Sequence, residues 1–118
     1  MKKALAFLAV GALLALLPLG LLAERTVPVW TAQATNVETA VDTTGAASAV
    51  VSIWAASGTP DGTVRIIYLP LGSPTYVTLA TYAMPTSVKS FRGPVGEGLR
   101  LVLTGNTTGT VGAVAVLK

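Results

Sequence analysis

The residues able to do acid–base chemistry here are carboxylates, because the chain contains neither cysteine nor histidine. Disulfides, thiolate nucleophiles, imidazole bases and the usual zinc ligands are therefore excluded. The five carboxylates are Glu24, Glu38, Asp42, Asp61 and Glu97. A paired-carboxylate hydrolase needs two carboxylates in one cleft. Because side chains alternate along a strand, Glu38 and Asp42 could lie on the same face of one strand. We expect these two on a solvated face, and therefore no catalytic residue.

The other patterns that could hold a ligand are weak. Residues 93–98 are glycine-rich, but no Lys-Ser/Thr pair and no helix follows, so we interpret them as a loop between strands. Calcium binding by Asp42 or Asp61 would need more clustered oxygens than the sequence provides. Asn106-Thr107-Thr108 matches a glycosylation acceptor at a loop tip, a triplet that arises often by chance. We predict no metal and no cofactor.

The N-terminal residues form a membrane or signal segment in this interpretation. Lys2 and Lys3 precede twenty uncharged residues, 4–23, which as a helix would be about 30 Å long, roughly the thickness of a bilayer. A cleaved signal and a retained anchor both remain open, because the cleavage pattern before Glu24 is imperfect. The basic residues at the start leave the rest of the chain outside the cytoplasm in either case. We take these positions as representative of the segment: Ala4, Leu5, Phe7, Leu13, Leu16 and Leu21.

From residue 26 onward the sequence has the pattern of a β-protein. Short runs rich in Val, Ile, Thr and Tyr alternate with turn residues, and no helical periodicity is sustained. We predict residues 1–25 as signal peptide or transmembrane anchor and residues 26–118 as one antiparallel β-sandwich, preceded by a hydrophobic helix. The expected strands are 26–31, 37–43, 47–55, 63–69, 76–83, 88–92, 99–104 and 110–117.

Two connections between these strands have strong turn chemistry. Thr59-Pro60-Asp61-Gly62 combines a proline that fixes φ with a glycine suited to the left-handed conformation. Residues 105–109 likewise have glycine and asparagine between two apolar runs. We expect a hairpin at each connection.

Strand alternation predicts which side chains form the core. Leu99, Leu101 and Leu103 share one face, and Val64, Ile66 and Tyr68 share another. The opposite faces are still partly apolar, which indicates either a contact with another subunit or an ordinary scatter of exposed aliphatics. We predict that a contact surface draws on this set: Trp30, Ile67, Leu69, Val102, Val114 and Val116. With Trp54, Tyr68, Tyr76 and Tyr82, Trp30 could instead line a sugar-binding platform.

The order of these features resembles the small β-sandwich modules of phage and prophage virion structural proteins. The resemblance covers about residues 35–118 and rests on the strand at 47–55, the turn at 57–62, the strand at 76–81 and the run 99–111. The sequence departs from those modules at 71–76, where they commonly carry Asp-Gly and Trp, and in having an attached membrane segment. The resemblance implies a structural role in a virion.

The composition agrees with an assembly role. Charged residues make up 11% of the chain and hydrophobic residues 52%, so part of the surface is expected to be covered. Residues 4–118 carry six basic and five acidic side chains, a balance that argues against nucleic-acid binding. We therefore expect a membrane-associated or exported structural protein of a virion or cell envelope, assembling with itself or with capsid or surface proteins. The alternative is a secreted β-sandwich module that binds carbohydrate or a cell surface.

Overall fold

The computed structural model describes residues 24–118, which form eight β-strands. All eight predicted strands are confirmed, with ends that differ by two residues at most. Within the described part of the chain, no helix is long and apolar enough to cross a bilayer. The predicted N-terminal helix, with Ala4, Leu5, Phe7, Leu13, Leu16 and Leu21, lies outside the described residues. The strands are β1 (Arg25–Gln33), β2 (Val37–Val41), β3 (Ser48–Ser57), β4 (Thr63–Leu69), β5 (Val77–Ala83), β6 (Lys89–Pro94), β7 (Gly98–Thr104) and β8 (Thr110–Leu117).

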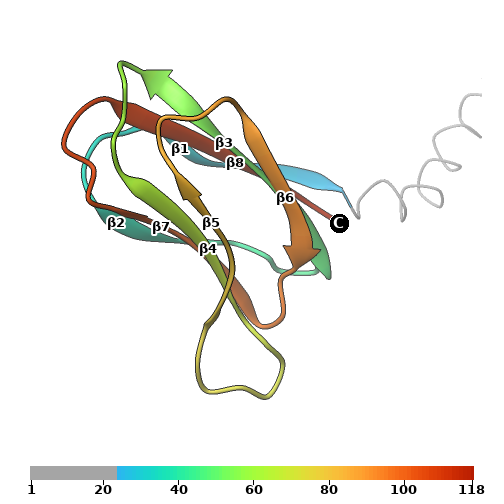
Figure 1. Ribbon diagram of the computed structural model, residues 1–118. Coiled ribbons are helices and arrows are strands. Elements are labelled where there is room, and N and C mark those ends of the chain that lie inside the picture. The colour runs from blue at the N-terminus through green and yellow to red at the C-terminus, as the bar shows by residue number, and fades with distance from the viewer. Residues whose placement is uncertain (1–23) are drawn as a thin grey trace, which may run out of the picture.

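The strands form two four-stranded antiparallel sheets that face each other (Figure 1). Sheet A has the order β1-β8-β3-β6, and sheet B has the order β2-β7-β4-β5. Only the β4–β5 connection joins neighbours within one sheet, whereas each of the other six connections passes from one sheet to the other. This order is that of a jelly roll, an architecture of two interleaved Greek keys.

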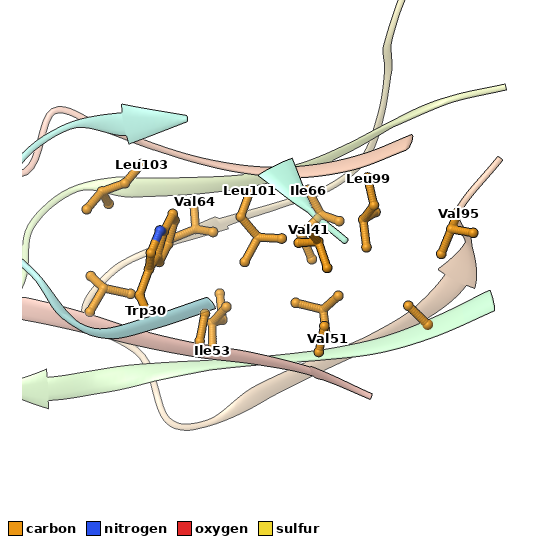
Figure 2. Close-up of a cluster of buried hydrophobic side chains, with 14 of the residues drawn as sticks. Trp30, Val41, Val51, Ile53, Val64, Ile66, Val95, Leu99, Leu101 and Leu103 are labelled. Atoms are coloured by element: carbon orange, nitrogen blue, oxygen red, sulfur yellow. The ribbon is translucent and has the colours of Figure 1, made fainter. Parts of the chain in front are cut away.

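The core lies between the sheets and follows the predicted alternation. Leu99, Leu101 and Leu103 of β7 are at most 2% exposed, and Val64 and Ile66 of β4 at most 1%. Figure 2 shows side chains of both sheets converging on this layer. Since each buried aliphatic side chain contributes about 1.5–3 kcal/mol, this layer dominates the stability of the domain. Sheet A supplies Ala49, Val51, Ile53, Val111, Ala113, Ala115 and Leu117.

The two predicted hairpins are wrong in their pairing. Residues 58–62 join β3 of sheet A to β4 of sheet B, and residues 105–109 join β7 of sheet B to β8 of sheet A. The predicted chain reversals are present, but in the first of them the positive φ is at Gly58 and not, as expected from the turn sequence, at Gly62; Gly105 and Gly109 are at positive φ in the second. Turn chemistry determines that the chain reverses, but the choice between pairing in one sheet and crossing the core depends on long-range contacts.

Candidate assembly surfaces

The five carboxylates all have structural partners. Thr44 donates its hydroxyl and its backbone N–H to Asp42, and these hydrogen bonds, chiefly the hydroxyl one, lower the pKa of that carboxyl. The corresponding bond from the Thr107 hydroxyl lowers the pKa of Asp61 to about 2. Glu38 and Asp42, the pair weighed for hydrolysis, are therefore tied to different neighbours. The other contacts are Glu24 with Lys118, Glu38 with Arg100, and Glu97 with the backbone N–H of Gly72.

A polar hollow of about 490 Å³ lies between the loop at 42–46 and the loop at 96–98. Asp42, Glu97, Arg100 and Tyr76 are among the side chains that line it. Asp42 and Glu97 already accept hydrogen bonds from their own or neighbouring loops, and Arg100 is paired with Glu38. The hollow thus has charged walls, but the contacts of these groups stabilise loops and strands.

On the outer face of sheet B, two predicted contact residues are covered by their own domain. Ile67 and Val102 are only 7% and 6% exposed. Each lies directly opposite an arginine on the neighbouring strand, Ile67 opposite Arg100 and Val102 opposite Arg65. Because the long aliphatic stems of arginine can lie over apolar neighbours while the charge stays in water, these aliphatics are buried although they point away from the core. Leu69, the predicted contact residue that follows Ile67 on the same face of β4, is partly exposed.

Arg100 contacts two polar side chains on the outer face of sheet B. Its guanidinium bonds to the carboxylate of Glu38 on β2 and lies 4.7 Å from the ring centroid of Tyr76. The hydrogen bond to Glu38 is the main cause that raises the pKa of Arg100. Such an exposed ion pair adds little to stability by itself, but it restricts the position of the arginine side chain.

The outer face of sheet A carries several apolar side chains, although Arg92 lies directly opposite one of them, Val50. Val114 and Val116 of β8 point outward, because their neighbours Ala113, Ala115 and Leu117 are buried in the core. Both valines are partly exposed, and no arginine lies directly opposite either of them within sheet A. We call the surface formed by Pro28, Val50, Trp54, Val114 and Val116 the aliphatic face.

Trp54 extends the aliphatic face over a glycine. Its ring lies across Gly112, so close that a Cβ at position 112 would come within 2.4 Å of the ring. Gly112 is directly opposite Trp54 in the β3–β8 ladder. A glycine inside a strand commonly marks such a close approach, and here it lets an aromatic ring lie flat on the sheet.

The other aromatic side chains do not gather into one platform. Trp30 is 5% exposed and donates its indole N–H to the hydroxyl of Thr39, 2.9 Å away, so it links β1 to β2 inside the sandwich. Tyr68 and Tyr82 pack against the core, and Tyr76 lies beside Arg100. Of the predicted contact residues, Leu69, Val114 and Val116 are partly exposed.

Sequence reasoning missed the role of Asn106. Its side chain is nearly buried, and its amide group donates to the backbone carbonyls of Ala34 and Gly109. In the triplet that matched a glycosylation site, the amide nitrogen that would carry the sugar therefore already donates two hydrogen bonds inside the protein. An asparagine between two glycines in a loop was the available signal, since asparagine side chains often bond to nearby backbone.

An apolar hollow of about 480 Å³ lies at the end of the sandwich where β1 begins. Among its lining residues are Ala47, Tyr68, Pro70 and Pro94, together with Leu71, which is 78% exposed. The β4–β5 loop that carries Leu71 projects beyond the sheets (Figure 1). Exposed leucines occur singly on many soluble domains, so this one adds only modest apolar area.

No protein-family model and no curated protein matches the sequence. Among solved structures, the crystal structure of the SPBc2 prophage-derived protein YomS is similar, with a TM-score of 0.61 and 7% identity over 80% of this chain and 91% of that chain. A structure of Bacillus endospore appendages, described as a family of disulfide-linked pili, gives a TM-score of 0.50 and 23% identity over 80% of this chain and 82% of that one. At these identities the likeness establishes a shared all-β fold.

Proposed function

We propose that the protein is a non-enzymatic structural subunit of a virion or of a cell-surface assembly. In this proposal residues 4–23 anchor the chain in a membrane or direct its export, and the β-sandwich packs against further copies or against capsid or surface proteins outside the cytoplasm. The observation that carries the proposal is the aliphatic face, an apolar and partly exposed sheet surface on a domain with few charges. Faces of this kind commonly mark contacts between proteins.

Two further observations support a mechanical role. All five carboxylates are engaged in contacts that hold loops and strands together. The fold is also shared with a prophage-derived protein and with a pilus-forming appendage protein. Because this chain has no cysteine, its subunits would be held by non-covalent contacts, unlike the disulfide-linked pili.

Self-association of the full chain tests the proposal directly. We expect the chain, purified in detergent and then freed of it, to form ordered particles or fibres that electron microscopy detects. Val114→Lys places a charge on the aliphatic face and should weaken assembly. Thr104→Lys, an exposed change on sheet B, is the matched control and should leave assembly intact. A chain that stays monomeric at every concentration, without any co-purifying structural protein, would overturn the proposal.

The intact mass of the protein in its native particle or membrane fraction then separates the two fates of the leader. A mass that includes residues 4–23 would make this a membrane-anchored subunit. A mass that begins near Glu24 would make it an exported subunit whose assembly takes place in solution or on a surface.

A further inference from the structure

The sandwich has four edge strands, two on each side. On one side are β1 and β2, which Trp30 and Thr39 connect through their hydrogen bond. On the other side are β5 and β6, where the side chain of Leu79 reaches toward Gly93. Each edge strand offers unpaired backbone groups to any further strand that approaches it.

The edges of sheet A are protected against such pairing. Strand β1 contains Pro28 and two irregularities in its pairing with β8. Strand β6 ends with Pro94 and carries Lys89 and Arg92. Prolines, bulges and charges on edge strands are the usual means by which sheets avoid adding strands.

The edges of sheet B are much less protected. Strand β5 has the sequence VTLATYA, without charge or proline, and its single irregularity lies between its pairs with Ile66 and Ile67. Residues 80–83 therefore form a regular edge segment. Strand β2 has one charged residue, Glu38, which is already paired with Arg100, and no proline. An uncharged strand of high β-propensity at an exposed edge is a preferred site of strand addition.

The direction of the strands makes a head-to-tail contact possible. Sheet B has four strands, and each runs antiparallel to its neighbours, so β2 and β5 run in opposite directions. When a second copy is placed beside the first in the same orientation, its β2 lies antiparallel to the β5 of the first copy. An antiparallel ladder can then form without any rearrangement.

Charge favours this contact over a two-fold contact between two β5 strands. Residues 77–94 carry Lys89 and Arg92 and no acidic residue, whereas residues 24–42 carry three acidic side chains and one arginine. A two-fold contact would bring two basic rims together. A head-to-tail contact avoids this repulsion, because it brings the basic rim of one copy to a rim of the next whose acidic side chains already have basic partners, Glu24 with Lys118 and Glu38 with Arg100.

We propose that strand β5 of one copy adds to strand β2 of the next, so that sheet B continues from subunit to subunit. This inference rests on the proposed assembly function and adds a second contact to the one at the aliphatic face. Thr81, Arg65, Val102 and Glu38 form one row across sheet B. When this row continues into the next copy, Thr81 of the first copy lies opposite Glu38 of the next. Repetition of this contact extends the assembly until a rotation closes a ring.

Engineered cysteines test this contact cleanly, because the chain has none of its own. Within one subunit, positions 38 and 81 are three strand spacings apart, about 14 Å, which is beyond the reach of a disulfide. Under mild oxidation, the full-length double variant Glu38→Cys/Thr81→Cys should therefore form a ladder of dimers, trimers and larger species on a non-reducing gel. A mixture of the two single variants should form a dimer that contains one chain of each.

Matched controls make the outcome decisive. Thr31→Cys/Thr81→Cys moves one cysteine to the exposed part of β1 and should not form the ladder. Dimers formed by Thr81→Cys alone would indicate a two-fold β5 contact and would overturn the inference. Assembly seen by electron microscopy without the 38–81 cross-link would overturn the inference and leave the structural role intact. Absence of any assembly would overturn both.

Discussion

Asn106 and Asp61 lie in two different sheet-crossing loops and hold those loops together. The side-chain oxygen of Asn106 accepts the backbone N–H groups of Asp61 and Gly62, each at 3.1 Å. In return, the carboxylate of Asp61 accepts the backbone N–H groups of Thr107 and Thr108. The reciprocal bonds satisfy backbone groups that turns would otherwise leave unpaired, so this end of the sandwich is closed by one polar cluster.

Replacing Asn106 should therefore be costly. We expect Asn106→Ala to lower the free energy of unfolding by about 2–4 kcal/mol, because it removes partners from several backbone groups in a nearly buried place. Chemical denaturation followed by circular dichroism measures the change. Ser87→Ala, an exposed substitution in another loop at the same end, is the control and should have little effect. If Asn106→Ala loses no more stability than the control, Asn106 does not hold the two loops together as argued.

Stability at acid pH should depend on Asp61. The pKa of Asp61 is about 2 in the folded protein, below its value of about 3.9 in an unfolded chain. A lowered pKa means that the folded state favours the carboxylate, so this contribution is present above pH ~4 and is lost as the pH falls toward ~2. Melting temperatures between pH 5 and 2 should fall less steeply for Asp61→Asn than for the unchanged protein. Equal slopes would contradict the prediction.

The bond between Trp30 and Thr39 should contribute to the joining of the two sheets. Thr39→Val keeps the shape of the side chain but leaves the indole N–H of Trp30 without its acceptor. We expect a loss of about 1–2 kcal/mol, the usual cost of an unsatisfied polar group in a largely buried place. Thr104→Val, an exposed change on β7, is the matched control. If both variants unfold at the same denaturant concentration, the bond has no measurable role.

Because the ring of Trp54 contacts Gly112, we expect the stability of the domain to be sensitive to a single methyl group added at position 112. Gly112→Ala would place its Cβ within 2.4 Å of the ring, and such overpacking costs about 1–3 kcal/mol. Trp54→Ala removes the obstacle, so the double variant should lose less stability than the sum of the two single changes. Tryptophan fluorescence of Gly112→Ala should report a displaced ring. Additive losses and an unchanged emission maximum would argue against the contact.

The strands were predictable from sequence because each has its own pattern. Alternation in Leu99, Leu101 and Leu103 specifies which side faces the core, and the structure buries all three. The pairing of strands had no comparable signal. The turns at 58–62 and 105–109 have the chemistry of hairpins, yet both cross between sheets, because partner choice depends on contacts far along the chain.

The contact surface was only partly predictable for a related reason. Alternation correctly placed Ile67 and Val102 on the outward face of their strands, but both are buried, and each has an arginine directly opposite it in the ladder. Whether an outward aliphatic side chain is exposed depends on the cross-strand neighbour, and the neighbour follows from the topology. Val114 and Val116 have no such arginine in sheet A and remain partly exposed.

Two substitutions of Arg100 can separate the effect of its aliphatic stem, which lies opposite Ile67, from the effect of its charge. Arg100→Met keeps an apolar stem opposite Ile67 but removes the charge, whereas Arg100→Ala removes both. If the stem covers the aliphatic residues, Arg100→Ala should lower the melting temperature clearly more than Arg100→Met, since an exposed ion pair adds little by itself. Raised salt should leave the difference unchanged, because screening acts on charge and not on burial. Equal losses that disappear at high salt would instead assign the role of Arg100 to its bond with Glu38.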